Sequence, residues 1–78
     1  MTHNEIWGAI ECFARGRGLS CSGLAKNSGL DPTTFNKSKR WSRFGQERWP
    51  STHSIAKILA ATDSNIEDFA RYIPKKEH

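Results

Sequence analysis

The chain has 78 residues and a formal net charge of +4 at pH 7, because 12 lysines and arginines outnumber 8 acidic residues. This length allows one small domain, which buries only about 60% of its unfolded surface, and leaves no room for a large catalytic cleft beside a binding domain. The positive charge favours a polyanionic partner, with nucleic acid preferred over a membrane surface. No apolar run approaches the ~20 residues of a membrane span, and no signal-peptide core is visible, so we expect a cytoplasmic location.

The two cysteines, Cys12 and Cys21, lack the spacing of a metal or redox motif, and the three histidines do not complete one. We therefore expect two reduced thiols, no metal and no cofactor, with a disulfide or thiol sensor as the less favoured alternative. Neither a nucleophile elbow nor a Ser-His-Asp arrangement is visible, so we expect no catalysis by this chain.

A first helix is predicted near the N-terminus. Residues 1–4 are expected to be loose, although Thr2 and Glu5 have the spacing of a capping box and can start the helix. The apolar residues that follow repeat at helical spacing: Ile6, Trp7, Ala9, Ile10, Phe13 and Ala14. The Arg-Gly-Arg-Gly run at 15–18 then ends the helix.

Residues 20–40 predict two short helices joined by a tight turn. Ser20 is a good N-cap for the first, and Gly29 can adopt the left-handed conformation that ends it. Asp31 can cap the second helix, and Pro32 occupies its first position, where a missing N–H costs nothing. A turn this short forces a steep crossing of the two helices, as in a helix-turn-helix.

The second helix, residues 32–40, would carry a face of hydrogen-bond donors. Leu30 and Phe35 have the spacing of a hydrophobic staple that fixes its start. The opposite stripe, at i, i+3, i+4 and i+7, consists of Thr33, Asn36, Lys37 and Arg40. Such a face can read base edges in the major groove of DNA, although a polar stripe is more often a simple solvated face.

This stretch resembles the helix-turn-helix of phage-repressor-like, XRE-type DNA-binding domains. Residues 29–40, Gly-Leu-Asp-Pro-Thr-Thr-Phe-Asn-Lys-Ser-Lys-Arg, followed by Arg-Trp-Pro-Ser-Thr at 48–52, are similar to the N-terminal domains of bacterial regulators that carry a LexA-like self-cleaving peptidase domain. The similarity covers about residues 6–69. It implies an all-α, five-helix lambda-repressor-like fold and base contacts at Thr33 and Lys37. Pro32 stands where relatives often carry glutamine.

Residues 41–50 have too little periodicity for a helix, and Phe44-Gly45 indicates a turn. Two interpretations are open and compatible. The rings of Trp41 and Trp49 can fold back as a lid on the core. Arg43 and Arg48 can clamp phosphates beside the second helix of the pair.

Two helices complete the predicted domain, which spans residues 1–74. Ser51 is expected to cap a core helix whose N-terminus either binds a phosphate or is simply self-capped. Ser64 and Glu67 are expected to form the capping box of a last helix, with Ile66, Phe69, Ala70 and Ile73 facing inward and Pro74 ending it. The expected core, besides the first helix, is Leu24, Leu30, Phe35, Ile55, Ile58, Leu59 and Phe69. Residues 75–78 are a tail or the start of a linker.

We expect sequence-specific binding of double-stranded DNA by the DNA-binding domain of a transcriptional regulator, with a repressor as the favoured type and helix 32–40 in the major groove. The expected base-contacting residues are Thr33, Thr34, Asn36 and Lys37. The expected phosphate-contacting residues are Ser22, Lys39, Arg40, Arg43, Arg48, Ser51 and Thr52. The resemblance implies a homodimer of a longer protein on an inverted-repeat operator.

The alternative is a helical protein-interaction module, either an adaptor or an antitoxin-like partner binder. In that case Trp41, Phe44 and Trp49 would form an exposed contact patch in the loop.

Overall fold

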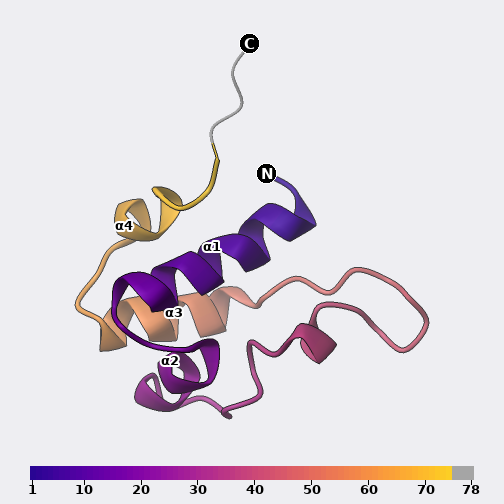
Figure 1. The fold of residues 1–78 in the computed structure, drawn as a ribbon, viewed down its shortest axis with the longest axis horizontal. Helices are drawn as coiled ribbons and strands as arrows, with labels where there is room; N and C mark the ends of the chain where they lie inside the picture. Colours follow the sequence, from indigo (N-terminus) through magenta and orange to yellow (C-terminus); the bar gives the residue numbers. More distant parts are fainter. Residues whose placement is uncertain (75–78) are drawn as a thin grey trace.

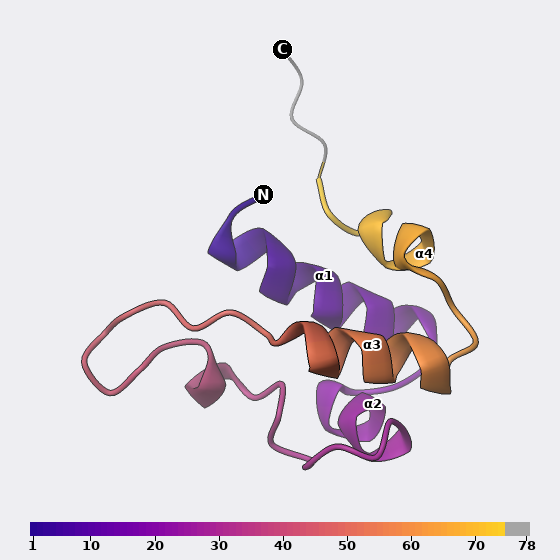
Figure 2. The ribbon, with the colours of Figure 1, turned by 180° about the vertical axis from the view of Figure 1, so that it is seen from behind.

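The computed structural model describes residues 1–74 and places a long first helix, α1 (His3–Gly16), at the centre of the fold. The other helices are α2 (Cys21–Asn27), α3 (Thr52–Ala61) and α4 (Ile66–Ala70), and a single 3-10 turn, η1, spans Lys37–Lys39. Helix α1 packs against α2 and α4, and α2 packs against α3. Residues 40–50 project sideways from these helices in both views of the ribbon (Figures 1 and 2).

The core forms where the apolar stripe of α1 meets one face of each other helix. Its largest fully buried side chains are Ile10, Phe13, Leu24, Phe35, Ile58 and Phe69. Phe13 and Phe69 meet edge to face, with ring centroids 5.7 Å apart, which is a favoured aromatic geometry. The predicted core is confirmed at Leu24, Phe35, Ile58 and Phe69. The remaining members, Leu30, Ile55 and Leu59, are partly buried against it.

The local signals for helix ends are confirmed at several positions. Thr2 and Glu5 form the capping box of α1, and the hydroxyls of Ser20 and Ser51 cap α2 and α3. Gly29 has a φ of +73°. The N–H of Leu30 donates to the carbonyl of Ala25 at 2.9 Å, which closes a Schellman motif at the end of α2.

The predicted helix over residues 32–40 is not formed. Residues 32–35 make a turn, and Asn36 is extended, with φ −66° and ψ 152°, before the short η1. The hydroxyl of Thr33 donates to the carboxylate of Asp31, and that of Thr34 donates to the carbonyl of Asp31, each at 2.6 Å. Such local hydrogen bonds compete with the helical pattern, and threonine is a weak helix former.

Residues 1–74 therefore contain four α-helices rather than the five expected. The chain is all-α as predicted, and within the described residues its only β-type pairing is an isolated bridge between Trp41 and Glu47. The second helix of a helix-turn-helix is absent. None of the described helices is long and apolar enough to cross a membrane.

The start of the last helix is also corrected. Asn65 and Asp68, not Ser64 and Glu67, form the capping box of α4. The reason lies in the preceding turn: Asp63 takes a left-handed φ of +53°, and the N–H of Ser64 closes a Schellman motif on α3. This shift turns Ile66 outward, where it is 59% exposed.

Ala70 of α4 is likewise exposed rather than inward-facing. Phe69 is buried as predicted, and Ile73 is partly buried against the core. The predicted tail, residues 75–78, lies outside the described residues.

Gly29→Ala and Gly8→Ala should change stability in opposite directions. A Cβ at either position meets no heavy atom within 4 Å, so only the backbone conformation decides the effect. At Gly29 the left-handed conformation should cost alanine about 1 kcal/mol of unfolding free energy. Inside α1, Gly8→Ala should add about 0.5–1 kcal/mol. Urea denaturation of both variants measures the difference, and shifts of the same sign would contradict the end of α2 described above.

Candidate nucleic-acid interface

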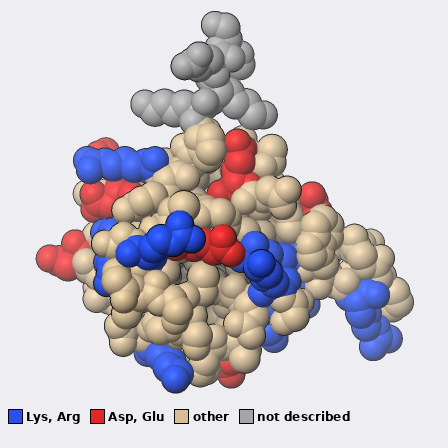
Figure 3. All heavy atoms as spheres, in the orientation of Figure 1, with Lys and Arg blue, Asp and Glu red and all other residues tan. Residues whose placement is uncertain are grey.

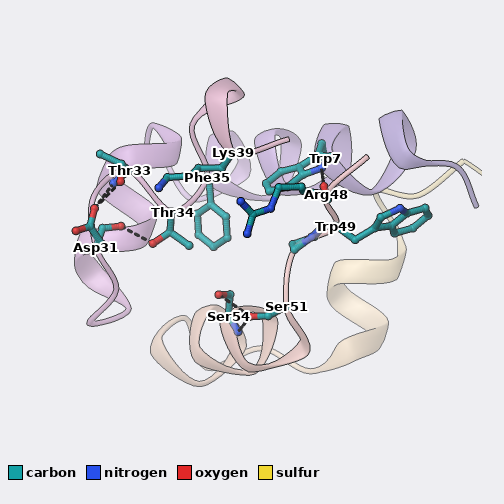
Figure 4. Close-up of a pocket in the computed structure, with 11 residues that line it drawn as sticks. Trp7, Asp31, Thr33, Thr34, Phe35, Lys39, Arg48, Trp49, Ser51 and Ser54 are labelled. Atoms are coloured by element: carbon teal, nitrogen blue, oxygen red, sulfur yellow. Dashed lines mark hydrogen bonds between the residues drawn. The ribbon is translucent and has the colours of Figure 1, made fainter. Parts of the chain in front are cut away.

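A groove of about 400 Å³ opens between residues 31–39, residues 48–50 and the N-terminus of α3. The aromatic rings of Trp7 and Phe35 contribute apolar lining. The polar side chains around it are Asp31, Thr33, Thr34, Lys39, Arg48, Ser51 and Ser54. Figure 4 shows the guanidinium of Arg48 extending toward the ring of Phe35. We call this opening the basic groove, because two cations and one carboxylate line it.

The carboxylate that lines the basic groove already accepts hydrogen bonds from a neighbouring residue of the chain. Asp31 accepts hydrogen bonds from the backbone N–H of Thr33 at 2.8 Å and from the Thr33 hydroxyl. These hydrogen bonds lower the pKa of Asp31, with Lys39 adding a smaller electrostatic effect. The side chains that line the groove therefore carry a net positive charge. In addition, α3 points the positive end of its helix dipole toward the groove.

The predicted base-contacting residues do not share one face. Thr33 and Thr34 line the basic groove, but both hydroxyls already donate to Asp31. Asn36 is exposed on the extended link before η1. Lys37 borders a second hollow, which it shares with Glu11, Arg15, Leu19, Ser20 and Cys21.

Three of the predicted phosphate contacts meet at the basic groove: Lys39, Arg48 and Ser51. Thr52 is the first residue of α3, directly after Ser51. Ser22 is half-buried on α2, and Arg43 lies in the projecting loop. Figure 3 shows Lys or Arg atoms at the far end of that loop with no acidic atoms around them on the visible face.

Arg40 faces the interior of the fold. Its Nη2 donates to Oε1 of Glu11 at 2.6 Å, and its Cζ lies 5.3 Å from the ring centroid of Trp7. The hydrogen bond from Arg40 is the main reason why the pKa of Glu11 lies below its ordinary value of 4.5. The structure thus gives Arg40 a role in holding residues 37–40 against α1.

His3 is the residue that sequence reasoning missed. It was expected in a loose segment, yet it lies in the first turn of α1 and is only 4% exposed. Its Nε2 lies 2.8 Å from the carbonyl oxygen of Arg40 and 3.1 Å from that of Arg48. The indole Nε1 of Trp7 also lies 3.2 Å from Nε2. Because two carbonyl oxygens lie closer to Nε2 than this donor does, we assign a hydrogen to Nε2. The indole N–H of Trp7 donates to the carbonyl of Arg48 at 2.9 Å.

These contacts close the base of a projecting loop, residues 41–47. The N–H of Arg48 donates to the carbonyl of Arg40, and the N–H of Ser42 donates to the carbonyl of Gln46, each at 2.8 Å. The expected turn at Phe44-Gly45 is confirmed, with a φ of +79° at Gly45. Phe44 stands at the turn and is 78% exposed.

Trp41, at the start of the loop, and Trp49, just after it, cover His3 rather than the main core. The ring centroids of Trp41 and Trp49 lie 4.6 and 6.0 Å from that of His3, and each tryptophan remains 48% exposed. The predicted lid on the core is therefore not formed, because the two rings lie against His3 and about half of each residue remains exposed.

Within residues 1–74, no three His, Cys, Asp or Glu side chains form a group that could hold a metal ion. Cys12 and Cys21 are both free thiols, and burial raises the pKa of Cys21. Comparison of the chain with protein-family models, with curated proteins and with solved structures found no match.

Glu11→Gln should make the protein less sensitive to acid. The folded pKa of Glu11 lies below its unfolded value, so its stabilisation is complete above about pH 4.5 and is lost as pH falls through the folded pKa. We expect the variant to lose about 0.5–1 kcal/mol of unfolding free energy at pH 7. Chemical denaturation at a series of pH values should show this difference shrinking as the pH falls below about 4.5.

Glu47→Gln, in the exposed loop, is the matched control for the loss of one carboxylate, and its loss of unfolding free energy at pH 7 should be smaller than that of Glu11→Gln. Parallel stability curves for Glu11→Gln and the unaltered chain from pH 7 to pH 3 would rule out a stabilising ion pair with Arg40.

Proposed function

We propose that this chain binds double-stranded DNA as the DNA-binding domain of a transcriptional regulator. The observation that carries the proposal is the convergence of Lys39, Arg48 and the Ser51-capped end of α3 on one groove. A pair of cations beside a helix N-terminus suits a backbone phosphate. The net charge of +4 adds a long-range attraction for the same partner.

Base recognition is the finer part of this proposal. Because residues 32–40 form a turn and a 3-10 turn, base edges would be met by an irregular segment rather than by an α-helix. Asn36 and Lys37 are exposed on this segment, and both side chains have standard base partners, adenine for asparagine and guanine for lysine. Phosphate contacts by Lys39 and Arg48 would set the register in which these side chains reach the bases.

The resemblance to XRE-type repressor domains supports the same partner. It makes a repressor the favoured type of regulator and an inverted repeat the favoured target. A homodimer of a longer protein would then supply the second half-site contact.

A second candidate is a protein-interaction module, and one observation favours it. Phe44 is largely exposed, and Trp41 and Trp49, close to it in the chain, are each 48% exposed. Exposed aromatic residues are enriched at the centres of protein interfaces. Failure to retain any duplex in the selection described next would favour this candidate.

Selection from a random duplex DNA library at roughly 0.15 M salt, followed by sequencing, tests the proposed function. We expect enrichment of one short motif, and an inverted repeat would support dimeric binding. Retention of DNA without enrichment would leave non-specific phosphate binding, and a tethered dimer would then test whether the single domain is simply too weak.

The salt dependence of affinity for the enriched duplex tests the basic groove directly. Each lost phosphate contact should reduce the slope of log affinity against log salt by about 0.9. Lys39→Ala combined with Arg48→Ala should therefore reduce it by about 2. Lys57→Ala removes an exposed lysine that does not line the groove and should leave the slope unchanged. Equal effects of the groove variant and the control would exclude the groove as the phosphate site.

A further inference from the structure

Phe44 is the most exposed large apolar side chain of the described residues. It is 78% exposed, against 59% for Ile66 and 58% for Met1. Both of those residues lie near an end of a helix on the main body, whereas Phe44 stands on the loop that projects away from the helices (Figure 1). Nothing in the core or the groove accounts for an aromatic ring at this position.

The loop holds this ring outward on an ordered turn. The Ser42 hydroxyl oxygen accepts from the N–H of Phe44 at 3.2 Å and from the N–H of Gln46 at 3.1 Å. The N–H of Gly45 donates to the carbonyl of Ser42 at 3.0 Å. Because His3 fixes the base of the loop to α1, the ring of Phe44 lies at the tip of a loop whose two ends are held together.

One cation lies against the ring. The guanidinium carbon of Arg43 lies 5.0 Å from the ring centroid of Phe44, within the range of a cation–π contact. Arg48 follows at the base of the same loop and lines the basic groove. An apolar ring with a guanidinium group beside it matches the chemistry of a base step, in which stacked bases lie next to charged phosphates.

We infer that Phe44 is a wedge that inserts between adjacent base pairs of duplex DNA and bends the duplex, while Arg43 contacts a flanking phosphate. The inference rests on the proposed function and adds a second contacting element to the basic groove. Proteins that insert apolar side chains in this way usually enter from the minor groove and kink the duplex by roughly 20–90°. A tip of two or three residues fits that groove, which is too narrow for a helix.

The experiment uses a duplex of about 30 base pairs that contains the selected motif, with a fluorophore at each end. Energy transfer between the ends reports bending, and anisotropy of the same duplex reports affinity. The unaltered chain should raise energy transfer on binding. Phe44→Ala should abolish that rise and weaken binding about tenfold, while Phe44→Leu, which keeps an apolar wedge, should retain part of it.

Ile66→Ala is the matched control, because it removes an exposed apolar side chain from α4. It should leave bending and affinity unchanged. Circular dichroism of each variant confirms that the helices are intact, and Phe44→Ala should fold normally because the side chain is exposed.

The outcomes separate the two proposals. If the unaltered chain binds duplex DNA and Phe44→Ala bends it equally, the wedge is overturned and the proposed function stands. If Phe44→Ala weakens binding only to single-stranded DNA, the ring stacks on unpaired bases and the wedge is overturned. If the unaltered chain binds no DNA, both proposals fail together.

Discussion

The position of the projecting loop, residues 41–47, depends on hydrogen bonds to two backbone carbonyls, those of Arg40 and Arg48. Both carbonyls lie at the base of the projecting loop, and ring N–H groups from α1 meet them there, from His3 and Trp7. A buried carbonyl without a donor costs about 1–3 kcal/mol. These donors therefore hold the loop, and with it one wall of the basic groove, in place against the helical core.

The helix ends could be predicted from the sequence because each depends on residues three or four positions apart. The hydroxyls of Thr2, Ser20 and Ser51 cap their helices as expected, and Gly29 supplies the left-handed turn. The same kind of reasoning was wrong for residues 32–40. Asp31, predicted as the cap of a helix, instead accepts hydrogen bonds from the two threonine hydroxyls in a local network that replaces the first turn of that helix.

The candidate site depended on tertiary contacts that the sequence pattern does not contain. Lys39, Arg48 and Ser51 were each predicted to meet phosphate, but their meeting at one groove follows from how the loop docks on α1. Arg40 belonged to the same predicted set, and its ion pair with Glu11 spans 29 positions. His3 carried no signal, because a lone histidine near a chain end matches no spacing rule.

The sequence separation of the loop contacts has a consequence for the order of folding. His3 lies 37 positions from Arg40 and 45 from Arg48, whereas the caps of α1, α2 and α3 join residues three apart. Closing a long stretch of chain costs entropy before any contact offsets it. Helices α1 and α2 can therefore form and pair first, and the loop docks late. In the native protein the loop should correspondingly be among the first regions to open, well below the free energy of global unfolding.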